Sequence, residues 1–342
     1  MAISGKEFVL VTGGAGYIGS HCVRRLLESD FNVVVVDNLS TGHRWAVPEG
    51  VQFVECDASN SAMVAEALRK YNVSVVLHFA GYIIVPDSVK DPLKYYANNV
   101  GVSRNLVETC LRNRVQRFIF SSSAAVYGEP RISPTPESTR PAPINPYGTT
   151  KLITEWMLRD VAASSELRYV ALRYFNVAGA RADGTLGQAT PNATHLVKIA
   201  AEAACGLRSQ VSIFGTDYAT RDGTCIRDYI HVDDLADAHI AALRHLCAGG
   251  SSGVYNCGYG TGYSVREILG TMKDVSGAPF NVVEARRRIG DPAALVADAA
   301  AIVRDFGWSP RLNDIRVICE SAYRWERHLS SLRNSQTGKI PQ

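Results

Sequence analysis

The sequence predicts an α/β protein built on a doubly wound parallel sheet, followed by a smaller lobe. Two observations predict this class. In the first half of the chain, short runs that are apolar on both faces alternate with amphipathic stretches, and a glycine-rich turn follows the first run. Strands covered on both faces of a sheet carry such continuous apolar runs. Repeated strand–helix units with right-handed crossovers then build a parallel sheet between two helical layers.

We expect six strands in this half, at residues 8–11, 33–36, 51–56, 73–79, 115–120 and 169–172. The amphipathic stretches between them predict helices at 19–28, 62–71, 93–113 and 147–163. After about residue 175, Gly and Ala become frequent and the loops lengthen. Helices are expected there near 194–205, 232–246 and 265–275, with a strand near 253–257. We therefore predict a first domain over residues 1–176 and a smaller lobe over 177–342, parts of which return to the first domain.

Composition excludes several classes of function. The 342 residues carry 36 basic and 33 acidic side chains, a net charge of +3, which is too balanced to predict nucleic-acid or membrane-surface binding. The sequence contains no uninterrupted run of about 18 apolar residues, so we expect no membrane-spanning helix. The eight cysteines show no Cys-x-x-Cys pair and no accompanying His cluster, so we expect no metal site. Reduced thiols of this kind are typical of a cytoplasmic protein.

A glycine turn lies between the first predicted strand and the first predicted helix. It reads Gly13-x-x-Gly16-x-x-Gly19. Gly13 would allow the tight turn, Gly16 the close approach of a pyrophosphate, and Gly19 the packing of helix on strand. The helix N-terminus would then direct free N–H groups at the phosphates. A glycine-rich turn alone can be purely structural, but the strand before it and the helix after it favour a dinucleotide site.

The ends of the next strands carry residues that suit the rest of a dinucleotide. Asp37 ends the second predicted strand, 18 residues after Gly19, where a carboxylate binds the adenosine ribose hydroxyls. A carboxylate there repels a 2′-phosphate, so we predict NAD rather than NADP. Asp57 follows the third strand and could lie by the adenine amino group. The alternative for Asp37 is a helix or turn cap.

A Ser, Tyr and Lys constellation follows the fifth predicted strand. That strand ends in three serines, the last of which is Ser123, and Tyr147 and Lys151 share one face of the helix after it because they are four residues apart. A tyrosine has a pKa near 10 and is a poor base at neutral pH. A nearby ammonium and a positively charged nicotinamide would lower that pKa. Tyr147 could then take a proton from a hydroxyl as hydride leaves the same carbon, while Ser123 holds the hydroxyl.

At this point the residues resemble a known family. The segments 12–21, 37–40, 78–81, 95–99, 120–128, 172–176 and 222–231 are similar, in order, to those of UDP-glucose 4-epimerases, which are extended short-chain dehydrogenases/reductases. The resemblance extends from about residue 8 to residue 308. It implies a Rossmann-type NAD-binding domain and a lobe that binds a UDP-sugar. It also implies a tightly held NAD+, with hydride moving from C4 of the sugar and returning to the other face of a 4-keto sugar.

The resemblance assigns roles residue by residue. Catalysis falls on Tyr147, Lys151 and Ser123. Besides the three glycines, the cofactor contacts fall on Tyr17, Ile18, Asp37, Asn38, Leu39, Ser40, Thr41, Gly42, Asp57, Ala58, Phe79, Ala80, Gly81, Asn98, Tyr147, Lys151 and Phe175. The nucleotide-sugar contacts fall on Ser123, Asn176, His195, Ser212, Phe214, Arg227, Arg288 and Asp291. The two arginines suit a pyrophosphate because guanidinium forks match phosphate oxygens.

Three residues depart from the family pattern. Ile83 stands where many members carry a lysine that contacts the cofactor. His195 stands where some members carry an asparagine near the UDP phosphate, and it could instead be an ordinary buried histidine. Leu295 stands at a pocket position where tyrosine or a small residue separates narrow from N-acetyl-tolerant sugar ranges.

Several functions stay open at this level. The sugar could be a UDP-N-acetylhexosamine, UDP-xylose or UDP-glucuronate. A nucleotide-sugar 4,6-dehydratase is disfavoured, because Ala124 and Ala125 follow Ser123 where that class carries carboxylates. A net dehydrogenase would consume NAD in proportion to product. An NAD-sensing scaffold would usually lack the tyrosine or the lysine. The resemblance also implies a homodimer that pairs through the helices expected at 93–113 and 147–163.

Overall fold

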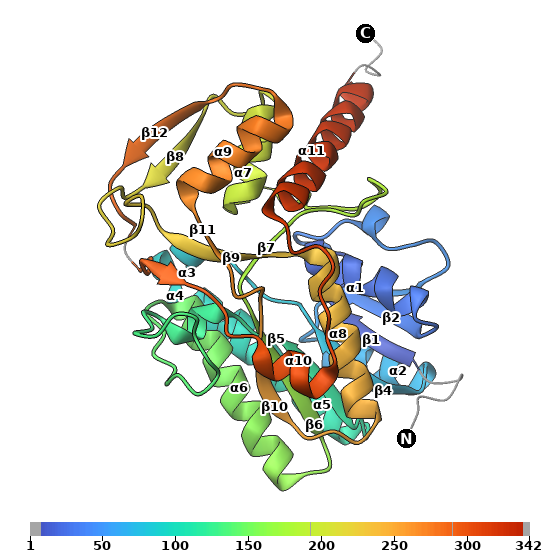
Figure 1. The fold of residues 1–342 in the computed structure, drawn as a ribbon. Helices are drawn as coiled ribbons and strands as arrows, with labels where there is room; N and C mark the ends of the chain where they lie inside the picture. The colour runs from blue at the N-terminus through green and yellow to red at the C-terminus, as the bar shows by residue number, and fades with distance from the viewer. Residues whose placement is uncertain (1–7, 192, 289, 338–342) are drawn as a thin grey trace.

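A seven-stranded parallel sheet lies at the centre of the molecule (Figure 1). The computed structural model describes residues 8–191, 193–288 and 290–337. Across the sheet the strands follow the order β10 (Gly253–Cys257), β6 (Arg168–Tyr174), β5 (Arg117–Ser121), β4 (Val73–His78), β1 (Phe8–Thr12), β2 (Asn32–Asp37) and β3 (Gln52–Glu55). Every neighbouring pair is parallel. The predicted doubly wound α/β class is confirmed.

Alternation along the central strand divides the core into two layers. Val9 and Val11 of β1 face a cluster that includes Val23 of α1 (Tyr17–Glu28) and Leu235 of α8 (Val232–Cys247). Leu10 faces the opposite cluster. The helices on that side are α2 (Ser61–Lys70), α5 (Val102–Arg112) and α6 (Pro146–Ser164). All three β1 side chains are fully buried, which explains why this strand is apolar on both faces.

The helix expected at 93–113 is interrupted. The chain forms α4 (Pro92–Tyr95), then the π-helix η2 (Tyr96–Gly101), and only then α5. Buried Asn99 lies in the π-helical segment, where its Oδ1 accepts the Tyr82 N–H at 2.8 Å and its Nδ2 donates to Thr150 Oγ1 at 3.1 Å. These bonds tie the segment to the chain after β4 and to α6. Hydrophobic periodicity could not predict this break, because it depends on a polar contact between distant segments.

Part of the second half joins the central sheet. β10, the strand expected near 253–257, pairs with β6 at the sheet edge, and α8 packs beside α1. α10 (Ala300–Phe306) also packs on α8 and β10. These three elements, all from the chain after residue 176, lie in or against the central sheet and its helices. The division of the chain into a cofactor domain and a substrate lobe remains a prediction.

The remaining elements form two smaller sheets and their covering helices (Figure 1, upper part). β8 (Gln210–Phe214) pairs with β12 (Asn281–Ala285). β9 (Ile226–His231) pairs with β7 (Asn176–Ala178), β11 (Gly262–Ser264) and β13 (Ala294–Leu295). Three helices, α7 (Leu196–Ala204), α9 (Val265–Ser276) and α11 (Ile315–Thr337), share one core. Short connecting helices lie at α3 (Val85–Lys90), η1 (Arg44–Ala46) and η3 (Ala124–Tyr127). None of the described helices is long and apolar enough to cross a bilayer.

A buried ion pair joins α6 to the sheet. Glu155 of α6 accepts two hydrogen bonds from the Arg173 guanidinium of β6, at 2.9 and 2.6 Å, and a third from the Ser122 hydroxyl at 2.5 Å. The two charged side chains are nearly inaccessible to solvent. Removing one partner of such a pair leaves the other charge buried without compensation, which costs about 3–5 kcal/mol.

We therefore expect Glu155→Leu to lower the free energy of unfolding by about 3–5 kcal/mol. Glu155→Leu combined with Arg173→Met should lose clearly less than the single variant, because the double variant leaves neither charge of this pair buried without its partner. Urea unfolding followed by circular dichroism measures both. Glu320→Leu is the control, since it breaks an exposed pair with Arg324 in α11 and should cost under about 1 kcal/mol. Equal losses for the single and double variants would contradict this account.

Candidate functional site

The glycine turn lies at the carboxyl edge of the central sheet. Gly13 has a φ of +70°, and a Cβ on it would lie 2.7 Å from the backbone nitrogen of Ala80. A Cβ on Gly19 would lie 2.2 Å from the Gly13 carbonyl oxygen. Gly16 is the N-cap of α1, and no side chain caps the helix there. The turn therefore requires glycine at two positions, and the first N–H groups of α1 have no side-chain partner.

Asp37 faces this turn from the end of β2. Its Oδ2 accepts the Ala15 N–H at 2.9 Å and its Oδ1 accepts the Leu39 N–H at 2.8 Å. A carboxylate has about four acceptor positions, so each oxygen can still accept a hydroxyl. Asp57 lies next to this group, because its carboxylate accepts from Asn38 Nδ2 at 2.9 Å. Burial tends to raise the pKa of Asp57, but the hydrogen bonds from Ser59 and Asn38 outweigh it and hold the pKa below its usual value.

These residues fit a dinucleotide. The tight glycine cradle, the uncapped helix N-terminus and the carboxylate at the end of the second strand supply what a pyrophosphate and a ribose require. The neighbouring loop after β4 lies directly against the cradle, since Phe79 N–H donates to the Thr12 carbonyl at 3.0 Å. Gly81 follows in that loop, within 4 Å of both Asn99 and the Lys151 amine if it carried a Cβ. The predicted cofactor residues from β1, β2 and β4 are thus brought to one edge.

The three predicted catalytic side chains also meet at this edge. Lys151 Nζ donates to the Ser121 carbonyl at 2.8 Å and lies 5.8 Å from the centre of the Tyr147 ring. The Ser123 side chain acts to lower the pKa of the Tyr147 phenol, and its Oγ accepts the Ala125 N–H at 3.2 Å. The backbone N–H of Tyr147 donates to Ser88 Oγ at 3.2 Å, which fixes the first turn of α6 against α3. Both Tyr147 and Lys151 are buried.

Burial controls the protonation of this pair. It lowers the pKa of Lys151 to about 8, and the opposing charge of Glu155 reduces the effect. Burial also raises the pKa of Tyr147, against the opposing hydrogen bond from Ser123. The sequence argument expected the lysine and the nicotinamide to lower the tyrosine pKa. In the protein chain alone, desolvation of the phenol outweighs the effect of Ser123, so the pKa of Tyr147 is raised.

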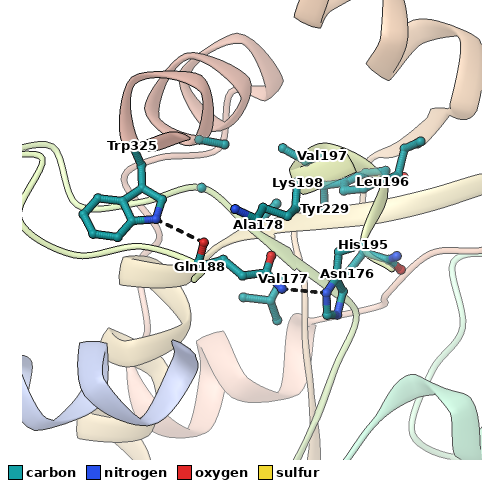
Figure 2. Close-up of a pocket in the computed structure, with 12 residues that line it drawn as sticks. Asn176, Val177, Ala178, Gln188, His195, Leu196, Val197, Lys198, Tyr229 and Trp325 are labelled. Atoms are coloured by element: carbon teal, nitrogen blue, oxygen red, sulfur yellow. Dashed lines mark hydrogen bonds between the residues drawn. The ribbon is translucent and has the colours of Figure 1, made fainter. Parts of the chain in front are cut away.

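The residues assigned to the nucleotide sugar come from the smaller sheets and the loops beside them. Asn176 begins β7 and His195 is the N-cap of α7, and both line one pocket (Figure 2). The Arg288 guanidinium lies 3.6 Å from the centre of the Phe214 ring in β8, the strand that also carries Ser212. Arg227 of β9 lies 3.7 Å from the carboxylate of Asp291. The structure brings these residues into pairs rather than one shared contact.

Asp228 fixes the strand that carries Arg227. Its buried carboxylate accepts N–H groups from Tyr259, Gly260 and Ala297 at 2.8–3.2 Å. Burial raises the pKa of Asp228 to about 6, although these three bonds oppose it. The carboxylate therefore holds β9, the loop after β10 and the segment after β13 in one arrangement.

The residues that depart from the family pattern have different surroundings. Ile83 is 43% exposed at the surface. Leu295 is buried and packs in one cluster with Phe175 and with Ala124, the residue after Ser123. His195 hydrogen-bonds Gln188, a residue that sequence reasoning missed because it lies in a loop with no pattern of its own. No group of three potential metal ligands gathers among the described residues.

The comparisons with known proteins agree with this geometry. Residues 9–258 match the model of the NAD dependent epimerase/dehydratase family. A UDP-glucose 4-epimerase from Azospirillum brasilense is 52% identical over 321 residues, which cover 94% of this chain and 92% of that protein. A relative of the same description from Rhizobium meliloti is 45% identical, over 93% of this chain and 96% of that protein.

Solved structures agree as well. The UDP-glucose 4-epimerase from Brucella ovis, in complex with NAD, superposes with a TM-score of 0.90 at 47% identity, covering 93% of this chain and 97% of that one. The enzyme from Bifidobacterium longum, in complex with NAD+ and UDP, gives 0.89 at 37% identity over 94% and 98%. By its sequence, its fold and the arrangement of its sheet edge, this chain belongs to the NAD dependent epimerase/dehydratase family.

Proposed function

We propose that this protein is an NAD-dependent UDP-glucose 4-epimerase. It interconverts UDP-galactose and UDP-glucose by reversible oxidation at C4 of the sugar, through a 4-keto sugar. One observation carries the proposal. Tyr147, Ser123 and Lys151 meet at the sheet edge that also bears the glycine cradle and Asp37. The relatives that match nearly the whole chain carry the same description.

The cofactor would be held by the turn at Gly13, the first N–H groups of α1, and the carboxylates of Asp37 and Asp57. When bound, NAD+ supplies the hydride acceptor and donor for the reaction. The carboxylate of Asp37 favours two ribose hydroxyls over a phosphate, which supports NAD rather than NADP. Its two backbone bonds keep it aimed at the turn.

Tyr147 acts as the base and, on return, as the acid at the sugar 4-hydroxyl. Its phenol is buried, so its ionisation depends on fixed neighbours rather than on water. Ser123 acts to lower the pKa of the phenol, and its hydroxyl can hold the same sugar hydroxyl. The Lys151 ammonium, anchored on the Ser121 carbonyl, favours the phenolate through its charge.

The UDP group anchors the substrate while the sugar turns. Arg227 and Arg288 carry the positive charges that a diphosphate needs, and the ring of Phe214 offers an apolar face near Arg288. Interactions with this remote group can position the reacting carbon without contacting it. Dehydration at C6 is disfavoured, because Ala124 is buried and carries no acid or base beside Ser123.

The finer points are part of the same proposal. Leu295 packs against Phe175 and Ala124. The resemblance assigns a sugar-pocket position to this residue, and because leucine has an intermediate volume we propose the plain hexose as the preferred sugar over its N-acetyl form. We also propose a cytoplasmic homodimer. Leu93 of α4 and Trp156 of α6 are 78% and 48% exposed on the helices assigned to pairing, and all eight cysteines are free thiols.

The purified protein should convert UDP-galactose to UDP-glucose without added NAD. A chromatographic assay of the two UDP-sugars, alongside UDP-N-acetylgalactosamine, UDP-xylose and UDP-glucuronate, tests activity and sugar range together. Absorbance at the wavelength of reduced nicotinamide should show that NADH does not accumulate in proportion to product. Conversion that requires stoichiometric NAD would instead indicate a dehydrogenase.

Tyr147→Phe should lower kcat by about 10²–10⁴-fold, the usual contribution of a positioned acid–base group. Binding of NAD and UDP should change little, because the ring and its packing are kept. Steady-state kinetics and calorimetry measure the two effects separately. Tyr323→Phe, on α11 away from the sheet edge, is the matched control. A kcat near that of the unmodified protein would remove Tyr147 from its proposed role.

Lys151→Met should raise stability at neutral pH while abolishing activity. The folded pKa of about 8 lies below the ordinary 10.5, so burying the ammonium costs stability in full below about pH 8. That cost, on the order of 3 kcal/mol before the lost hydrogen bond is counted, disappears as the pH approaches the unfolded value. Thermal unfolding should show a gain over the unmodified protein that is largest near pH 7 and shrinks toward pH 10. Lys90→Met, at an exposed lysine, should show no such trend, and a constant gain across pH would contradict the account.

A further inference from the structure

The pocket lined by Asn176 and His195 has an unusual set of polar groups (Figure 2). It lies between β7, the start of α7 and α11, and the backbone of Leu196, Val197 and Lys198 forms part of its wall. These are the first residues of α7, and the side chain of the N-cap His195 makes no capping bond. The first N–H groups of a helix have no partner within it, so they favour an anion.

Gln188 determines which nitrogen of His195 carries the proton. The Gln188 amide nitrogen lies 2.8 Å from His195 Nδ1 (Figure 2). An amide nitrogen can only donate, so Nδ1 must accept. A neutral imidazole with an accepting Nδ1 carries its proton on Nε2. Within the part of the chain that the structure describes, no hydrogen bond occupies that Nε2–H.

Gln188 is itself held in place. It is buried, and its backbone carbonyl accepts the indole N–H of buried Trp325 at 3.1 Å (Figure 2). Trp325 belongs to α11, whereas His195 begins α7. The backbone of Gln188 is therefore held by α11, and its side-chain amide bonds the imidazole at the start of α7. The side-chain amide has little freedom to turn away from the imidazole.

The charges around the pocket are balanced. Lys198 of α7 points to Glu326 of α11 and lies 3.5 Å from Glu202, so its charge is met by acids. Tyr229 of β9 is the other titratable group in the wall, and burial raises its pKa, which leaves it neutral. Burial likewise lowers the pKa of His195. The imidazole therefore stays uncharged at neutral pH and acts as a donor without a net charge.

We propose that Gln188 is a positioning residue that holds His195 as the Nε2–H tautomer, so that the ring donates to a diphosphate oxygen of the nucleotide sugar. The inference rests on the proposed function for the identity of the ligand. It adds a residue that touches no substrate and acts through the imidazole. An asparagine at position 195 would supply an N–H donor without help from a neighbour, whereas Nε2 of an imidazole can be either a donor or an acceptor. The bond from Gln188 to Nδ1 makes Nε2 the donor.

Gln188→Glu tests the inference, because a carboxylate can only accept at the position where the Gln188 amide donates. The carboxylate accepts from Nδ1–H, which leaves the neutral ring with an acceptor at Nε2. In a Tyr147→Phe background, which slows turnover, binding of UDP-glucose to the NAD-loaded protein is measured by calorimetry at pH 6 and pH 8. The diphosphate of UDP-glucose has no protonation step in that range.

With Gln188 present, the affinity for UDP-glucose should be nearly constant between pH 6 and pH 8. After Gln188→Glu, the affinity should fall about tenfold or more at pH 8, the loss of one hydrogen bond to a charged group, and recover at pH 6 as the ring gains its second proton.

Two further measurements separate positioning from a structural role. Nitrogen-15 NMR of labelled histidine should show a protonated Nε2 and an unprotonated Nδ1 at His195 in the protein with Gln188, and the reverse after Gln188→Glu. The pH effect of Gln188→Glu should vanish when His195→Asn is also present, because an amide does not titrate. Gln116→Glu, at an exposed position outside the pocket lining, is the matched control.

The outcomes are distinct. A protonated Nδ1 in the protein with Gln188, or the same loss of affinity at both pH values after Gln188→Glu, would overturn the role of Gln188 while leaving the proposed function intact. If the protein with Gln188 does not bind UDP-glucose at all, the proposed function fails and the inference fails with it. A pH-dependent loss that His195→Asn abolishes supports both.

Discussion

The hydrogen bond from the buried Lys151 ammonium to the Ser121 carbonyl is the contact on which the arrangement of Tyr147, Lys151 and Ser123 at the carboxyl edge of the central sheet depends. It joins the first turns of α6 to the end of β5, so the helix that carries the phenol cannot shift relative to the strand that carries the serines. The amine is nearly inaccessible, and burial lowers its pKa to about 8, so the contact is made by a group that destabilises the fold when charged. Proteins keep such groups where chemistry requires a nearby charge.

Two acidic networks support this edge from behind. Glu155 bonds Ser122 and Arg173. Ser122 directly follows Ser121, whose carbonyl accepts the hydrogen bond from Lys151. Asp228 gathers three backbone N–H groups from segments that flank Arg227 and Leu295. Each carboxylate is buried among fixed donors. Glu155 joins α6 to the central sheet, and Asp228 joins β9 to the segments after β10 and β13. The geometry of the site is therefore set by groups that do not touch the reacting atoms.

Much of the cofactor edge could be predicted because its signals are local. Gly13 and Asp37 lie at strand ends that hydrophobic runs already locate, and Gly19 lies in the first turn of the helix that follows. The four-residue spacing of Tyr147 and Lys151 places them on one helix face. The substrate side was harder. β7, β11 and β13 have two or three residues each, too few for any period. The π-helical turn at Asn99 and the bond between Gln188 and His195 depend on residues brought together from distant segments. The assignments on that side came from resemblance rather than from local physics.

The late arrival of β10 has a consequence for how the chain matures on the ribosome. This strand pairs with β6 at the edge of the central sheet, yet it is made of residues 253–257. Until that segment has left the exit tunnel, β6 presents an open row of backbone groups, the kind of edge on which strands of other molecules add. The sheet is therefore completed only after the chain has been synthesised through residue 257. A fragment that stops at residue 176 would contain Tyr147 and Lys151 but would keep that edge exposed.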